Sequence, residues 1–158
     1  DIALERIKQV KELIDENEYD GQQILDYMDG CLAMHKKEYD TAIDFFTKSR
    51  DLCEERKKDI CFQYNSMLAY SYLKAGRYEE AIVEYLQDLS EFESARVFWS
   101  LWDIKSHYYL GQAYENLGQL HKAAEQYRIY VSTRQENAPD HPAIADANKR
   151  LRLIEKNL

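Results

Sequence analysis

The sequence predicts an all-α fold in which antiparallel helical hairpins are stacked on one another. Only two prolines and five glycines occur among the 158 residues, and no strand-like alternation stands out. Apolar residues recur at helical spacing, as at Ile7, Val10 and Ile14. A set of small and aromatic residues also recurs three times with constant spacing, which is typical of a helical repeat.

About eight helices are expected, separated by residues that interrupt the apolar spacing. Gly76 is placed to end one of them in the left-handed conformation, and Gly118 is expected to be a turn glycine that closes another. Residues 90–94 are expected to form a break or a poorly formed turn between two helices. Asp140 is expected to cap the last helix, with Pro142 in its first turn. The expected helices cover residues 2–16, 22–35, 40–55, 59–74, 78–89, 96–117, 119–133 and 141–156.

The last expected helix has one apolar stripe and one polar face. This is what the terminal cap of a helical stack needs, because only one side of it is covered. The stripe consists of Ile144, Ala147, Leu151, Ile154 and Leu158.

Charge and cysteine usage limit the classes of function. The net charge of −8 argues against non-specific binding of nucleic acid or anionic membrane, since both need a basic face. No apolar run approaches the ~18 residues of a membrane span. The three cysteines (Cys31, Cys53, Cys61) form no C-x-x-C pair, which predicts neither a disulfide framework nor a zinc site and favours a reducing, cytoplasmic location. The chain starts without Met, so we expect a piece of a longer protein.

The repeat is anchored on an alanine early in the second helix of each hairpin. An aromatic residue follows four positions later, and a small residue precedes the alanine by twelve. Small residues at this spacing predict a close crossing of the two helices, and we expect the aromatics to fill the space between one hairpin and the next. The alanines are Ala42, Ala81 and Ala123, the aromatics are Phe46, Tyr85 and Tyr127, and the small residues are Gly30, Ala69 and Gly111. One further period upstream lies Ala3, so residues 2–16 look like the second helix of a preceding repeat.

The segment LGQAYENLGQLHKAAEQY (110–127) resembles a tetratricopeptide repeat, whose pattern is L-G-x-x-Y, a turn glycine and A-x-x-x-F/Y. Residues 66–85 match nearly as well, and residues 28–46 match less well, with Lys37 in place of the turn glycine. The repeats are longer than the family's ~34 residues. We therefore expect a single right-handed superhelical domain over 1–158, with a half repeat or cap at 1–17, repeats at 22–57, 58–95 and 96–135, and a capping helix at 140–158.

No motif for catalysis, a cofactor or a metal is present. Cys31 and His35 lie four residues apart, but no second pair accompanies them, so we expect no metal site. Acidic pairs such as Glu79 and Glu80 are interpreted as a solvated face. The chain is therefore expected not to be an enzyme. Phe98, Trp99 and Trp102 could anchor a partner, but we favour packing within the chain.

The resemblance implies that the first helix of each hairpin lines a concave groove that binds a partner. Only Lys105 matches the Lys/Asn/Arg clamp of chaperone-binding members, so a receptor for their acidic tails is not expected. An aromatic and sparsely charged groove suits an amphipathic helix or an extended peptide. The groove positions are Tyr27, Cys31, Met34, His35, Gln63, Ser66, Met67, Tyr70, Lys74, Lys105, Tyr108, Tyr109, Gln112 and Asn116.

The sequence thus predicts a protein–protein interaction module, a scaffold or adaptor within a larger bacterial protein. Its partner would be a protein or peptide, with no nucleic acid, membrane or cofactor involved. Two alternatives stay open. One is a regulatory domain that senses a short peptide, and the other is a self-associating stack that uses the exposed apolar residues of 2–16.

Overall fold

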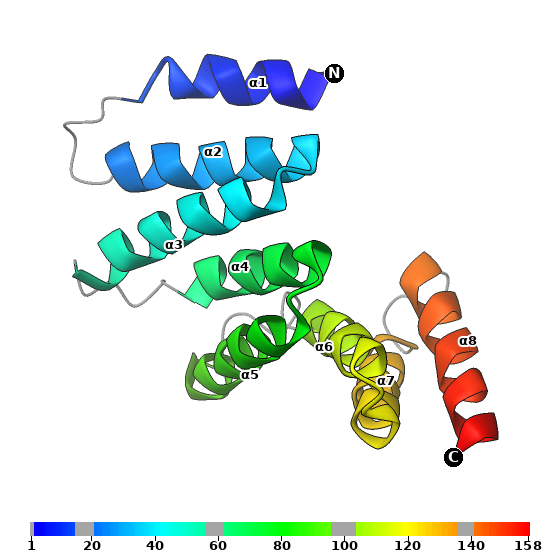
Figure 1. Ribbon diagram of the computed structural model, residues 1–158. Helices are drawn as coiled ribbons and strands as arrows, with labels where there is room; N and C mark the ends of the chain where they lie inside the picture. The colour runs from blue at the N-terminus through cyan, green and yellow to red at the C-terminus, as the bar shows by residue number, and fades with distance from the viewer. Residues whose placement is uncertain (1, 15–20, 56–61, 96–103, 136–140) are drawn as a thin grey trace. The chain divides into compact units, whose positions relative to one another are not determined.

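The computed structural model describes residues 2–14, 21–55, 62–95, 104–135 and 141–158 (Figure 1). These ranges contain eight helices and no strand, which confirms the predicted all-α class. The helices are α1 (Ile2–Lys11), α2 (Gly21–Lys36), α3 (Tyr39–Glu55), α4 (Phe62–Ala75), α5 (Tyr78–Ala95), α6 (Ile104–Asn116), α7 (Leu120–Gln135) and α8 (Pro142–Asn157).

The chain forms two compact units, Asp1–Gly76 with α1–α4 and Arg77–Leu158 with α5–α8. Within the first unit, α1 packs on α2, α2 on α3, and α3 on α4 (Figure 1). Within the second unit, α5 packs on α6, α6 on α7, and α7 on α8. Each unit is therefore a series of helices in which every helix covers the one before it.

Two helices end more than two residues away from the expected position. The predicted break at 90–94 is wrong, because α5 continues to Ala95. Ser90 does not interrupt it, since its hydroxyl donates a hydrogen bond of 2.8 Å to the carbonyl of Gln87 within the same helix. The first helix ends at Lys11 instead of residue 16. Residues 96–103, with Phe98, Trp99 and Trp102, and residues 59–61 at the expected start of α4 lie outside the described residues.

The N-cap of α8 is His141, not Asp140, which lies outside the described residues. His141 has an extended backbone (φ −68°, ψ 126°), and its Nδ1 accepts a hydrogen bond of 3.3 Å from the backbone N–H of Ala143. Pro142 follows in the first turn as predicted, where its missing N–H leaves no bond unmade.

The turns that end α2, α4 and α6 share one backbone conformation. Gly76 has φ of 78°, which confirms the predicted left-handed glycine, and the turn glycine Gly118 has φ of 70°. Lys37 occupies the equivalent place after α2 with φ 63°, and it is the one described non-glycine residue with positive φ. The α2–α3 and α6–α7 turns also share a hydrogen bond of 2.9 Å, from Glu38 N–H to Ala33 C=O and from Gln119 N–H to Tyr114 C=O.

The predicted close crossings occur in both hairpins that lie wholly inside a unit. A Cβ added to Gly30 would meet the Phe46 ring at 2.6 Å, and one added to Gly111 would meet the Tyr127 ring at 2.7 Å. Phe46 and Tyr127 are fully buried. Each ring lies over the glycine of its own hairpin, and Phe46 also shares a core with Leu68 of α4, the first helix of the next hairpin.

The state of the cysteines and the length of the apolar helices test two expectations drawn from the composition. Cys31 is a free thiol, but Cys53 is buried and disulfide-bonded. The prediction of a reducing compartment rested on cysteines that form no disulfide, so it loses that support. None of the described helices is long and apolar enough to cross a membrane.

Candidate functional site

In the first unit, four predicted groove residues pack against the interior. Tyr27, Cys31, Met34 and Met67 are half-buried and cover a core that consists of Ala33, Ala42, Ile43, Phe46 and Leu68. They therefore help to hold α2, α3 and α4 together.

The Tyr27 and Cys31 side chains occupy a low-dielectric position. The Tyr27 ring centroid lies 5.5 Å from those of both Phe46 and Tyr64. Burial, followed by the neighbouring Cys31, raises the pKa of Tyr27 to about 12. Burial also raises the pKa of the Cys31 thiol. At neutral pH this thiol stays protonated, which makes it a poor nucleophile and a poor metal ligand.

The more open part of the first unit lies along α4 and the end of α2. His35 and Lys74 are exposed, while Ser66 and Tyr70 are half-buried. The Lys74 ammonium lies over the Tyr70 ring, 5.2 Å from its centroid, a cation–π contact. The side chain of Gln63 lies outside the described part of the structure. Among the described residues, no group of three or more His, Cys, Asp or Glu side chains could hold a metal ion.

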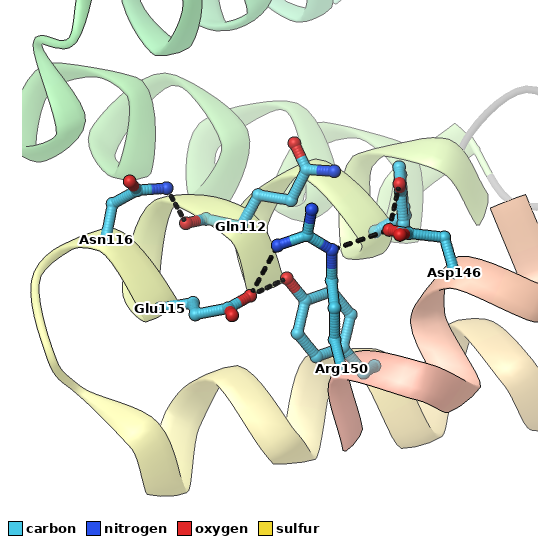
Figure 2. A network of polar contacts seen from close by, with 7 residues as sticks. Gln112, Glu115, Asn116, Asp146 and Arg150 are labelled. Carbon is cyan, nitrogen blue, oxygen red and sulfur yellow. Dashed lines mark hydrogen bonds and ion pairs between the residues drawn. The ribbon is translucent and has the colours of Figure 1, made fainter. Parts of the chain in front are cut away.

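In the second unit, the predicted groove residues form one stripe along α6, which we call the α6 stripe. Lys105 and Asn116 are exposed at its two ends, and Tyr108, Tyr109 and Gln112 are half-buried between them. The Asn116 amide donates a hydrogen bond of 2.8 Å to the backbone carbonyl of Gln112, as Figure 2 shows. The stripe therefore offers amide groups and aromatic edges with a single cation.

Tyr108 is fixed in place at the centre of the α6 stripe. Its hydroxyl donates a hydrogen bond of 2.7 Å to Asp146 Oδ2 of α8. Its ring centroid lies 5.2 Å from those of Tyr109 and Tyr130 and 6.2 Å from that of Tyr127. Burial, followed by the hydrogen bond to Asp146, raises the pKa of Tyr108 to about 12.

Arg150 of α8 joins α6, α7 and α8 in one polar network, which we call the Arg150 network (Figure 2). Its Nε donates to Asp146 Oδ2 at 2.5 Å, and its Nη1 donates to Glu115 Oε2 at 2.9 Å. The Tyr127 hydroxyl donates to the same Glu115 oxygen at 2.7 Å. The guanidinium thus bridges two carboxylates, each of which also accepts a tyrosine hydroxyl.

The protonation equilibria of the network follow from these bonds. Burial alone would lower the pKa of Arg150, but its hydrogen bonds to Asp146 and Glu115 outweigh burial and raise the pKa. Burial would raise the pKa of Asp146, but hydrogen bonds from Tyr108 and Arg150 lower it overall. Asp146 and Arg150 are therefore ionised at neutral pH, and their bonds to Tyr108 and Glu115 hold α8 against α6.

Asp146, Arg150 and Glu115 were not among the site residues predicted from the sequence. Asp146 and Arg150 are four residues apart on one helix, a spacing that favours an ion pair and could have marked them. The contact of Arg150 with Glu115 depends on how α8 packs beside α6, which no local spacing shows.

Two family models described as tetratricopeptide repeat match residues 62–89 and 105–133. No curated protein matches the chain.

Three solved structures illustrate the likeness of fold. Tetratricopeptide-like repeats of a putative kinesin light chain from Podosopora anserina are 16% identical with a TM-score of 0.71, and the match covers 98% of this chain and 76% of that one. The first tetratricopeptide domain of Spaghetti, bound to the HSP90 peptide SRMEEVD, is 19% identical over 91% of this chain and 95% of its own, with a TM-score of 0.64. The Rap conjugation gene regulator of plasmid pLS20, in complex with the Phr* peptide, is 15% identical over 85% of this chain and 37% of its own, with a TM-score of 0.72.

The family models match the two better copies that the repeat pattern had indicated, and the similar structures share the hairpin architecture. Residues 62–89 and 105–133 are tetratricopeptide repeats.

Proposed function

We propose that this chain is a non-catalytic protein-interaction module that binds a peptide or helix of a partner along the first helices of its hairpins. The observation that carries the proposal is the α6 stripe, where Tyr108 is fixed between exposed or half-exposed polar groups. Two structurally similar proteins were solved with bound peptides, which supports a peptide as the ligand.

The α6 stripe has the chemistry of a preorganised peptide site. Tyr108 is held by its hydrogen bond to Asp146 and by three neighbouring rings, so little conformational entropy would be lost on binding. Gln112 is half-buried and Asn116 is exposed, and amides of this kind can bond a peptide backbone. Because Lys105 is the one cation of the stripe, we propose a ligand with apolar anchors instead of a strongly acidic tail.

The test uses the full chain and a displayed library of short random peptides. Enriched peptides are synthesised, and their affinity is measured by calorimetry for the wild type, for the Gln112→Ala/Asn116→Ala variant and for the Tyr70→Ala variant. We expect Gln112→Ala/Asn116→Ala to weaken the binding of peptides held by the α6 stripe by roughly tenfold, because polar contacts that are lost without replacement cost about 1–2 kcal/mol in sum. Tyr70→Ala should weaken the binding of peptides held by the first unit by a similar factor, because an aromatic contact costs as much.

His121→Ala is the matched control, since His121 is exposed at the start of α7, outside the α6 stripe. It should bind as the wild type does. Tyr108→Ala is avoided because it would also disrupt α8. Peptides that bind all the variants with equal affinity would show that neither the α6 stripe nor Tyr70 forms the site.

Self-association is a second candidate, favoured by two exposed apolar side chains, one near the end of α1 and one in the turn that follows it. Leu13 is 85% exposed and Val10 43% exposed. We propose that a second copy covers them. Light scattering over a concentration series should then give a mass above one chain that falls to one chain in the Val10→Asp/Leu13→Asp variant. A mass of one chain at every concentration would exclude this candidate.

A further inference from the structure

The two faces of α8 differ in how their charges are used. One face is buried, with Ile144, Ala147 and Ile154 at most 4% exposed where α8 packs on α7. The opposite face, which we call the outer face, lines an open trough of about 560 Å³ along the helix. Its residues are Ala145, Asn148, Lys149, Arg152, Leu153 and Lys156.

Both acidic residues of α8 are occupied inside the second unit. Asp146 accepts hydrogen bonds from Tyr108 and Arg150. Glu155 forms an ion pair of 2.7 Å with Arg128 of α7. Both negative charges of α8 therefore take part in contacts that hold it to α6 and α7.

The three cations of the outer face have no such partners. Lys149, Arg152 and Lys156 are exposed, and none of them forms an ion pair with any residue that the structure describes. They lie three and four residues apart, so they share one side of the helix and repel one another. This is a purely basic row on a chain whose net charge is −8.

An exposed apolar side chain lies within the same row. Leu153 is 54% exposed, next to Arg152 in sequence, with Ala145 two turns earlier on the same face. A leucine flanked by cations complements a helix that carries apolar residues three and four apart with Glu or Asp beside them. Nucleic acid and anionic membrane fit less well, because the rest of the chain is acidic and would repel a polyanion.

We propose that the outer face of α8 is a docking site for an acidic amphipathic helix of a partner protein. The docked helix would lie along α8, with its apolar side chains on Leu153 and Ala145 and its carboxylates paired with Lys149, Arg152 and Lys156. This site is separate from the α6 stripe, and it does not depend on a peptide being bound there.

The probe is a synthetic helical peptide with leucines on one side and glutamates on both flanks. Two control peptides accompany it. One has the same composition in an order that destroys the apolar side, and the other has glutamine in place of every glutamate. Binding to the full chain is measured by fluorescence anisotropy at low and at physiological salt, and the site is mapped by amide chemical-shift changes.

We expect the amphipathic acidic peptide to bind, with shift changes confined to α8, and both control peptides to bind at least tenfold more weakly. The Lys149→Glu/Arg152→Glu/Lys156→Glu variant should lose at least roughly tenfold in affinity, since rim charges that attract become charges that repel. Leu153→Gln should weaken binding by about threefold to tenfold, because one apolar contact is lost. Binding should also weaken as salt rises.

The matched control is Arg6→Glu/Lys8→Glu/Lys36→Glu, which changes the net charge equally at three exposed positions of the first unit. Its affinity for the probe should lie within about twofold of the wild-type value. Any remaining difference would come from the long-range effect of net charge. Circular dichroism of both triple variants establishes that their helices are intact.

Several outcomes would overturn the proposal. Equal binding of the scrambled acidic peptide would mean that binding depends only on the net charge of the peptide. Shift changes on α6 instead of α8 would place the probe in the α6 stripe. Tighter binding of duplex DNA or anionic vesicles than of the probe would assign the basic row to another class of ligand. A concentration-dependent dimer that the triple reversal on α8 abolishes would make a second copy the occupant.

Discussion

Two hairpins of this chain solve the same packing problem and then differ in how they hold the next helix. In α2–α3, Phe46 lies over Gly30, and in α6–α7, Tyr127 lies over Gly111 at the same spacing. Tyr27 and Tyr108 are also equivalent, and each packs its ring beside the aromatic residue of its own hairpin.

The difference begins at one hydroxyl and one acid. Phe46 ends in a hydrogen, and the residue one turn along from Gly30 is Met34, whose sulfur accepts a hydrogen bond of 3.1 Å from Ser71 of α4. Tyr127 ends in a hydroxyl that binds Glu115, the residue equivalent to Met34, and Glu115 binds Arg150 of α8.

Apolar burial therefore holds the next helix in both units, and in the second unit the charges of the Arg150 network add to it. Leu68 of α4 is fully buried in the core with Phe46 and Ile43. Asp146 and Arg150 of α8 are about one-third exposed and joined to α6 by hydrogen bonds. The repeat fixes the crossing inside a hairpin, while the few residues beside that crossing decide which interaction attaches the following helix.

The glycine crossings should give the largest effects, and equal ones in the two hairpins. Gly30→Leu and Gly111→Leu each place a side chain where an aromatic ring already lies, at 2.6 and 2.7 Å from the added Cβ. We expect each to cost about 3 kcal/mol of unfolding free energy, the upper end for an overpacked site. Urea denaturation measures this value.

A rescue separates the clash from other causes. Phe46→Leu makes room beside Gly30, so Gly30→Ala/Phe46→Leu should be more stable than the sum of the two single losses predicts, a positive coupling in a double-mutant cycle. Strict additivity would mean that Gly30 and Phe46 do not compete for one space.

Arg150→Met should give the next largest effect, and it should act in the second unit. The change leaves Asp146 and Glu115 without their cation, but both are partly exposed, so water compensates in part. We expect a loss of about 1–2 kcal/mol and faster amide hydrogen exchange in α8. Exchange in α4 serves as the internal control and should stay unchanged. A uniform change in both units would contradict a local role for the Arg150 network.

The repeat spacing predicted the glycine crossings because contacts within a hairpin are set by helical geometry and a short turn. Gly30, Gly111 and the turn glycines Gly76 and Gly118 were all found on this basis. The Arg150 network could not be found in this way, since Glu115 and Arg150 meet only through the packing of α8 beside α6.

The cap of α8 shows the same limit at short range. Asp140 is a common capping residue, and a histidine is not, so propensity favoured the wrong position. What decides the cap is which residue has extended backbone while its side chain reaches back to the helix, and His141 does both. The predicted groove residues of α2 raise a similar point, because periodicity cannot tell a half-buried core residue such as Cys31 from a groove residue.

The turns offer a gain of stability in one hairpin and a loss in the other. Lys37 has φ 63° where Gly118 has φ 70°, and a left-handed conformation costs a non-glycine residue about 1 kcal/mol. Lys37→Gly should therefore stabilise the chain by up to about 1 kcal/mol, and Gly118→Ala should destabilise it by a similar amount. Thermal unfolding by calorimetry should show melting temperatures that move in opposite directions. Lys36→Gly is the control, since residue 36 is helical and the glycine there should destabilise.

Acid should have small and opposite effects on one aspartate of each unit. In the first unit, burial raises the pKa of Asp26 above 3.8, so the ionised form is disfavoured in the folded state. The folded protein then binds more protons than the unfolded one in the window just above pH 3.8, and stability from this group rises as pH falls. In the second unit, Tyr108 and Arg150 outweigh burial and lower the pKa of Asp146, so its contribution is present above pH 3.8 and is lost as pH falls through the folded pKa.

Asp26→Asn should therefore stabilise the protein at neutral pH and Asp146→Asn should destabilise it, each by less than about 1–2 kcal/mol because both sites retain contact with water. The difference for Asp26→Asn should shrink toward zero as the pH falls below 3.8, and the difference for Asp146→Asn should shrink only at lower pH, as the pH falls through the lowered pKa of the folded state. In each case the wild-type carboxyl then becomes protonated and resembles the amide. Urea denaturation of both variants across this range measures the two curves. Curves of the same sign would contradict burial as the main influence on Asp26, or the hydrogen bonds from Tyr108 and Arg150 as the main influence on Asp146.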